Sequence, residues 1–411
     1  MTSPAMALPP QDKATVRELA RRVMEMAQEP RMEAIRRRWR EVNALRRPDR
    51  APVWCRPVGC WREILPDTAL SCRHPWLRSL EYGFRQLLYK RDLDDDTPVE
   101  PYLAVPACLD IEPPNWWGVE VRRRLSDDLG GAWAYDPPLK TPADYDRLTS
   151  PRIRFDAATT QRQLTQAGEL LAGVMPVRRV CQPPLGGTLC TPAAELRGLE
   201  PMMLDMLDAP ELLHRLMAFL RDATLQTMEQ VAALGLLTPN TTEPMTCSDP
   251  LAAPSPAGDC TLAHCWGMVN SQEFDQVSPR LWEEFCLAYQ RPILARYGLV
   301  GYGCCENLTR KLDGVLSIPN LRILTCSAWT NLDKVIERAG SGYCIMWRQK
   351  ASQIVFADHP ESLRQSLDEG ARRLRGCRYQ IVLRELETLA GHPQRLFEWT
   401  RMAKEAAERY A

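Results

Sequence analysis

Two adjacent thiols and a carboxylate, Cys304, Cys305 and Glu306, follow a short apolar segment over 299–300 and precede a helix-like segment over 308–316. These side chains are therefore expected where a strand passes into a helix. Thiolates and carboxylates are ligand types that zinc takes in proteins. The residue types predict a metal site. The alternative is a pair of small side chains that fill a buried layer, since free cysteine is often buried.

The elements that would position these residues form a regular series in the last part of the chain. Four short apolar runs are each followed by a helical pattern, which is typical of the second half of a barrel with eight strand–helix units. The apolar runs lie at 299–302, 321–325, 343–347 and 379–383, and the helical patterns at 308–316, 330–339, 360–375 and 393–409. We therefore predict an α/β fold, a (β/α)8 TIM barrel, in which the strand ends meet at one mouth.

The N-terminal part predicts added helices. Two apolar stripes at helical spacing lie within 13–45 and are separated by Pro30. We expect residues 1–50 to form a helical extension and residues 51–411 to form the barrel. No Gly-x-Gly-x-x-Gly follows the apolar runs at 299–383, which disfavours a dinucleotide-binding fold.

Further polar and aromatic residues fall at the expected strand ends. Arg348 follows one late strand, and Glu385 and Glu387 follow the last, where a carboxylate could close the metal site. His264 is a candidate ligand or acid–base group at another strand end. Aromatic side chains that could wall a flat substrate are Trp266, Trp329 and Trp347. A structural role is the competing interpretation for His264.

Composition limits the partners. The chain has 411 residues, a formal net charge of +0 and 15 cysteines, with 45% hydrophobic and 25% charged residues. A balanced charge disfavours nucleic acid or an anionic membrane as a partner. No run approaches the roughly 18 consecutive apolar residues of a spanning helix. With no leader pattern at its start, we expect a cytoplasmic protein whose thiols are reduced.

From about residue 140 onward the chain resembles the uroporphyrinogen decarboxylase superfamily. The similarity is carried by Leu-Glu-Pro at 199–201, Leu-Asp-Ala-Pro-Glu at 207–211, Val-Ser-Pro at 277–279, Tyr-Gly-Cys-Cys-Glu-Asn-Leu at 302–308, Ile-Pro-Asn-Leu-Arg at 318–322 and Pro-Gln-Arg-Leu-Phe-Glu-Trp at 393–399. The resemblance implies a TIM barrel and one of two chemistries. These are cofactor-free decarboxylation of porphyrinogen acetates, and zinc-dependent methyl transfer involving thiols, corrinoids or folates.

The resemblance favours the second chemistry. The decarboxylases carry a motif of the type Met-Arg-Gln-Ala-Gly-Arg, whereas the nearest match here, at 52–59, lacks its Gln and second Arg. The methyltransferases carry His-x-Cys at one strand end, where Cys305 matches the cysteine. At the last strand, Glu387 stands where this branch often has histidine. The implied ligand set is Cys305 with Cys304, Glu306 and Glu387.

The sequence thus predicts a zinc-dependent methyltransferase or demethylase acting on a small, ring-containing substrate. In this prediction Cys305, Glu306 and His264 are catalytic, while Trp266, Trp329, Trp347 and Arg348 bind the substrate. Folate or corrinoid is the candidate methyl carrier, and a corrinoid protein and a second copy of the chain are candidate partners. The alternatives are a metal-free decarboxylase of a carboxylated substrate and a non-catalytic binding module.

Overall fold

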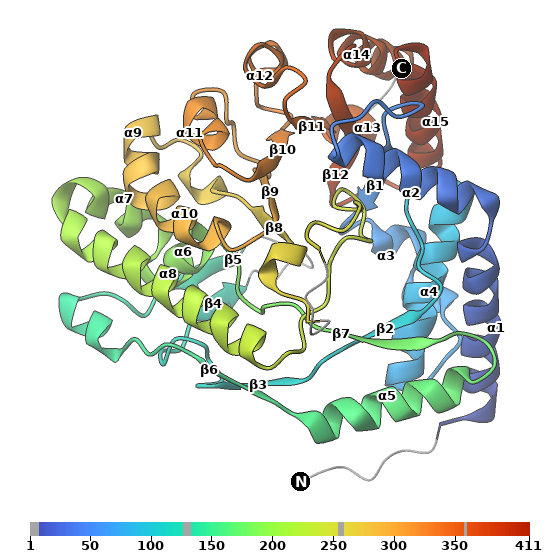
Figure 1. Cartoon of the computed structure of the whole chain (residues 1–411), viewed down its shortest axis with the longest axis horizontal. Helices are drawn as coiled ribbons and strands as arrows, with labels where there is room; N and C mark the ends of the chain where they lie inside the picture. The colour runs from blue at the N-terminus through green and yellow to red at the C-terminus, as the bar shows by residue number, and fades with distance from the viewer. Residues whose placement is uncertain (1–7, 126–132, 254–258, 357–359) are drawn as a thin grey trace.

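The computed structural model describes residues 8–125, 133–253, 259–356 and 360–411. Its centre is a curled parallel sheet of six strands in the order β1-β12-β11-β10-β9-β8 (Figure 1). The strands are β1 (Val53–Pro57), β8 (Trp266–Val269), β9 (Leu299–Tyr302), β10 (Leu321–Cys326), β11 (Cys344–Gln349) and β12 (Arg378–Leu386). The strands predicted from the apolar runs at 299–383 are thus present and adjacent.

Three further strand pairs lie outside that sheet. The parallel pair is β2 (Leu103–Pro106) with β7 (Val177–Val180), and the antiparallel pairs are β3 (Leu109–Glu112) with β6 (Arg152–Phe155) and β4 (Arg122–Leu125) with β5 (Trp133–Asp136). In the part of the chain that the structure describes, β2 and β7 pair with each other and not with the edges of the large sheet. The predicted closure into an eight-stranded barrel is therefore not confirmed.

Side chains occupy both edges of the six-stranded sheet. On β1, the backbone N–H of Val53 donates to Asp96 at 2.7 Å and that of Cys55 donates to Asp95 at 2.9 Å. On β8, the amide of Asn240 receives the N–H of Trp266 at 2.7 Å and donates to its carbonyl at 3.0 Å. These side chains take the backbone groups that a neighbouring strand would pair, which explains why the strand ladder stops at β1 and β8.

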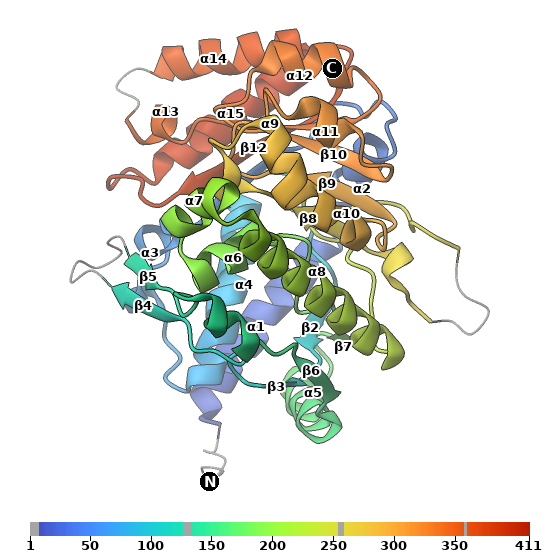
Figure 2. The same ribbon diagram turned by 90° about the vertical axis from the view of Figure 1, so that its left-hand side faces the viewer.

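Helices pack around the sheet. The first group is α1 (Pro10–Ala27), α2 (Pro30–Asn43), α3 (Trp61–Ile64), α4 (Pro75–Leu93), α5 (Ala157–Leu171), α6 (Cys190–Arg197), α7 (Leu199–Asp208) and α8 (Pro210–Ala233). The second is α9 (Pro279–Trp282), α10 (Ala288–Leu294), α11 (Leu312–Leu316), α12 (Leu332–Ala339), α13 (Ser352–Val355), α14 (Pro360–Arg373) and α15 (Gln394–Arg409). Figure 2 shows α14 and α15 at the opposite end of the molecule from the N-terminal helix α1. Among the helices of the described residues, none is long and apolar enough to cross a membrane.

The N-terminal helices form as the sequence predicts. Pro30 opens α2 at a position where its missing N–H is not needed, so the helical region divides into α1 and α2. The apolar stripe of α1 is buried and the helix packs along α4. Residues 10–43 therefore add a helical layer to the sheet.

Alternation along the strands separates two cores. Side chains on the inner face of the curled sheet form one buried cluster: Trp54, Trp266, Ile323, Cys344, Met346 and Val382. Their strand neighbours belong to the other cluster, under the outer helices: Val53, Cys55, Ile345, Trp347, Ile381 and Leu383. Since successive side chains of a strand point to opposite faces, the face of any residue near a strand end follows from this register.

Candidate functional site

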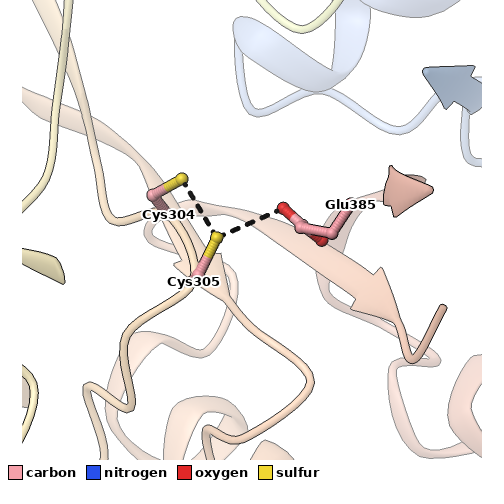
Figure 3. A group of neighbouring side chains, drawn as sticks. All are labelled: Cys304, Cys305 and Glu385. Carbon is pink, nitrogen blue, oxygen red and sulfur yellow. Dashed lines mark hydrogen bonds between the residues drawn. The ribbon is translucent and has the colours of Figure 1, made fainter. Parts of the chain in front are cut away.

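Two thiols and a carboxylate meet at the C-terminal ends of β9 and β12. The Sγ atoms of Cys304 and Cys305 are 3.5 Å apart, and Cys305 Sγ lies 3.5 Å from Oε1 of Glu385 (Figure 3). One ligand atom from each of the three residues lies within 4.8 Å of the others. The first two are the thiols that the sequence predicts, and the third comes from 80 residues further along the chain.

The turn before the thiols requires glycine. Gly303 has a φ of +108°, a backbone conformation that side chains with a Cβ rarely adopt. A Cβ there would also lie 2.8 Å from Leu308 Cδ1 and 2.9 Å from Thr325 Cβ. The Tyr-Gly-Cys-Cys sequence thus turns the chain sharply off β9 and carries both thiols to the end of the sheet.

Glu306 anchors this turn and is not part of the three-residue group. Its buried carboxylate accepts the backbone N–H of Cys304 and that of Ser271, each at 2.8 Å. Burial raises the pKa of Glu306. The structure therefore places this carboxylate on the backbone beneath the thiols, whereas the sequence predicted it as a ligand and a catalytic group.

Glu385 reaches the thiols because β12 is irregular at its end. Cys55 pairs with Leu383 but Pro57 pairs with Leu386, so β12 holds one more residue than β1 over this interval. Within this bulge Glu385 has a φ of +61°. Strand alternation alone would send Glu385 to the face opposite Arg384, and the bulge redirects its side chain.

A buried guanidinium connects the group. Arg348 is nearly inaccessible, with 2% of its side chain exposed, and its Nη1 donates to Glu385 at 2.9 Å and to Cys304 Sγ at 3.6 Å. The hydrogen bond with Cys305, together with the charge of Arg348, lowers the pKa of Cys304 to about 5. The same hydrogen bond and burial raise the pKa of Cys305. The opposite directions of these two pKa shifts favour the thiolate form of Cys304 over that of Cys305.

The donor set fits zinc in chemistry and spacing. Tetrahedral zinc with Zn–S bonds of about 2.3 Å and Zn–O bonds of about 2.1 Å would hold two sulfurs about 3.8 Å apart and a sulfur and an oxygen about 3.6 Å apart. The observed separations of 3.5 Å and 3.5 Å are close to these edges. Three protein ligands would leave a fourth position for another ligand, as in catalytic zinc sites.

Two predicted residues lie elsewhere. The exposed side chain of Glu387 lies against Gly59, where any added Cβ would overlap its carboxylate, and the group formed by the thiols does not include it. His264 precedes β8, so it stands at the start of a strand rather than at its C-terminal end. Its ring nitrogens bond the Thr261 backbone N–H and the Ala253 carbonyl, each at 3.0 Å.

The predicted aromatic residues are also dispersed. Trp266 is buried at the first position of β8, with its indole N–H 3.0 Å from the Ser248 hydroxyl. Trp347 faces the outer helices and packs on Gly370 of α14. Trp329 is 60% exposed, with the Lys350 ammonium 4.6 Å from its ring centre. Trp347 and Arg348 both line an open cleft of about 600 Å³ between α12 and α14. The three tryptophans therefore do not form one wall.

Sequence reasoning did not assign Arg384, which lies near the end of β12. Arg384 is half-buried, and burial, followed by the positive charges of Arg348 and Arg56, lowers its pKa. The available signal was the alternation of β12, since Arg384 follows the inner-face residue Val382 by two positions. The same spacing of two positions places Arg56 after Trp54 on β1 and Arg348 after Met346 on β11, so both side chains are also expected on the inner face.

Comparison with known proteins gives limited similarity. No protein-family model matches the chain, and no curated protein matches it. Among solved structures, a methyltransferase from Methanosarcina mazei aligns with 90% of this chain and 98% of its own, at 11% identity and a TM-score of 0.46.

Proposed function

We propose that this chain is a zinc-dependent methyltransferase or demethylase of the uroporphyrinogen decarboxylase-like superfamily that acts on a small, ring-containing substrate. The observation that carries the proposal is the group formed by Cys304, Cys305 and Glu385, whose ligand atoms lie within 4.8 Å of one another. The group stands at the C-terminal ends of parallel strands, where barrel enzymes place their active sites. The resemblance in the run 302–308 adds the reaction class.

The proposed metal ligands differ from the predicted set at two positions. Glu385 replaces Glu387 in the proposed ligand set, and Glu306 is left out because its carboxylate binds the backbone of the turn. Bound zinc would act as a Lewis acid and lower the pKa of a thiol, alcohol or water in its fourth position. Arg348 orients Glu385 and stabilises the thiolate of Cys304. It therefore supports two of the proposed ligands in the position and charge that metal binding requires.

Methyl transfer needs a donor held opposite the acceptor. The methyl group leaves its donor atom without the bonding electron pair, and the acceptor supplies the pair for the new bond. The role of the chain is to bind and orient the two molecules at reacting distances of roughly 3 to 3.5 Å. We propose a folate or a corrinoid as methyl carrier, the corrinoid free or on a separate protein.

A metal-free decarboxylase of a carboxylated substrate is the second candidate. It is favoured by the three arginines near the thiols, since guanidinium groups bind carboxylates. Three arginines do not match the eight carboxylates of uroporphyrinogen, each of which would need a charged partner. We therefore expect no release of carbon dioxide from uroporphyrinogen at an enzymatic rate.

Metal content tests the first proposal. Protein purified without chelator is expected to hold about one zinc per chain, and Cys305→Ser is expected to lose it. Cys326→Ser is the matched control, because Cys326 is a buried thiol at the end of β10 that lies outside the three-residue group. Equal and near-zero metal in the wild type and Cys305→Ser would show that the zinc proposal is wrong.

A further inference from the structure

Three neighbouring strands each carry an arginine near the C-terminal end, on the inner face of the sheet. β1, β12 and β11 lie side by side, and their inner-face residues Trp54, Val382 and Met346 belong to one buried cluster. Two positions further along each strand stand Arg56, Arg384 and Arg348. Because side chains alternate between faces, the three guanidiniums lie on the inner face near the ends of these strands, above an apolar floor. Arg348 pairs in register with Val382, so it stands one inner-face position below Arg384.

These arginines are only partly satisfied by the protein. Nε of Arg348 and Nε of Arg384 are buried and have no hydrogen-bond partner among the described residues. The unpaired Nε of Arg348 is the stronger evidence, because only 2% of the Arg348 side chain is exposed. A buried charged donor without a partner is uncommon in a native protein. These arginines therefore present donors that the described residues leave free.

The charge around these three arginines is also unbalanced. Glu385 is the carboxylate that pairs with Arg348, at 2.9 Å. Arg384 lies close enough to Arg348 and Arg56 for their charges to perturb it, and the thiol of Cys304 and the carboxylate of Glu385 are its opposing neighbours. Among the described residues, the groups of opposite charge that act on Arg384 are thus the thiol of Cys304 and the carboxylate of Glu385, and three arginines beside them leave room for an added anion.

We propose that Arg56, Arg348 and Arg384 bind an oxyanion of the substrate, a carboxylate or a phosphate, and so direct the remainder of the substrate toward Cys304 and Cys305. Guanidinium groups offer paired N–H donors that match both oxyanions. The assignment of the anion to the substrate rests on the proposed function. The binding of the anion itself requires no metal.

The test uses metal-free protein, so that the anion cannot bind through zinc. Protein treated with chelator and then freed of it is titrated calorimetrically with inorganic phosphate and with acetate at fixed ionic strength, because salt screens exposed charges such as Arg56. The wild type is expected to bind one equivalent of at least one of the two anions. Preference for phosphate indicates a phosphorylated substrate, and preference for acetate indicates a carboxylic acid.

Arg384→Gln and Arg56→Gln are each expected to weaken that binding about tenfold or more, since each removes a charge-assisted hydrogen bond. The control is Arg338→Gln, an exposed arginine on α12 whose partner is Asp313, and it should leave the affinity unchanged. Circular dichroism checks the fold. If Arg384→Gln is misfolded, Arg56→Gln decides the outcome, because Arg56 is exposed.

Two results would overturn this inference: no binding of either anion by the wild type, or equal affinities in the wild type and the folded arginine variants. Metal content separates it from the proposed function. A protein that binds phosphate or acetate through these arginines but holds no zinc keeps the anion site and loses the zinc methyltransferase proposal.

Discussion

Nη1 of Arg348 lies 2.9 Å from Oε1 of Glu385, and this contact joins the ends of β11 and β12 at the thiols. The guanidinium is almost fully buried, whereas the carboxylate is 39% exposed. The arginine is therefore the fixed partner, and it holds a carboxylate that would otherwise be mobile in water. The same guanidinium faces Cys304, so a single side chain sets both the position of a carboxylate and the charge of a thiol.

Replacement of Arg348 should have two measurable effects. In Arg348→Gln we expect the free energy of unfolding to fall by about 1 to 3 kcal/mol, because a charge-assisted hydrogen bond is lost. The pKa of Cys304 should rise from its value of about 5, because a stabilising positive charge is removed. Urea unfolding measures the first effect and the pH dependence of alkylation measures the second. An unchanged alkylation profile would show that Arg348 does not stabilise the thiolate.

The two thiols should differ in reactivity in metal-free protein. Cys304 is expected to react with iodoacetamide down to about pH 5, while Cys305 resists at neutral pH because its pKa is raised. Peptide mass spectrometry after brief alkylation between pH 4 and pH 9 identifies which thiol reacts. Preferential alkylation of Cys305 at pH 6 would contradict the assignment of the thiolate.

The lowered pKa of Cys304 also predicts a pH dependence of stability. Its pKa is about 5 in the folded chain and near 9 for an ordinary cysteine. A group with a lowered pKa stabilises the folded state fully above its unfolded value, and this contribution is lost as pH falls toward the folded value. The stability difference between the metal-free wild type and Cys304→Ser should therefore shrink from pH 9 to pH 5. A difference that stays constant over this range would be the contrary result.

Glu385 and Glu387 provide a matched pair of substitutions. Glu385→Gln should weaken zinc binding by at least about tenfold, since even residues that only support a ligand typically change metal affinity by that factor. Glu387→Gln should leave zinc affinity unchanged, because its side chain lies against Gly59 and outside the group. Competition with a chromophoric chelator measures both affinities. The reverse order would restore the ligand set predicted from the sequence.

Gly303 should be intolerant of any side chain. Gly303→Ala combines a φ of +108° with contacts of 2.8 Å and 2.9 Å to Leu308 and Thr325. We expect a loss of about 1 to 3 kcal/mol in the free energy of unfolding. Gly186→Ala is the control, because no atom lies within 4 Å of its added Cβ and its φ is not positive. Thermal denaturation of both variants decides whether the turn is constrained as described.

Local sequence patterns determined the order of the late elements. Apolar runs followed by helical periodicity predicted β9 to β12 and helices close to α12, α14 and α15, since both patterns depend on neighbours a few residues apart. The helix predicted over 308–316 is shorter, because α11 begins only at Leu312. These local patterns could not predict whether the sheet closes into a barrel. Closure depends on the edges of β1 and β8, where Asp95, Asp96 and Asn240 occupy the backbone groups.

The sequence by itself determined that Cys304 and Cys305 stand where a strand ends, because an apolar run and the glycine-rich turn after it are local. Only the tertiary structure decided their partners. A bulge of one residue in β12 and the positive φ of Glu385 bring that carboxylate to the thiols in place of Glu387. The strand order brings Arg56, Arg384 and Arg348 together near the ends of β1, β12 and β11, and the register pairs Arg348 with Val382, one inner-face position before Arg384. Register and bulges arise from pairing between segments hundreds of residues apart, and no local pattern records them.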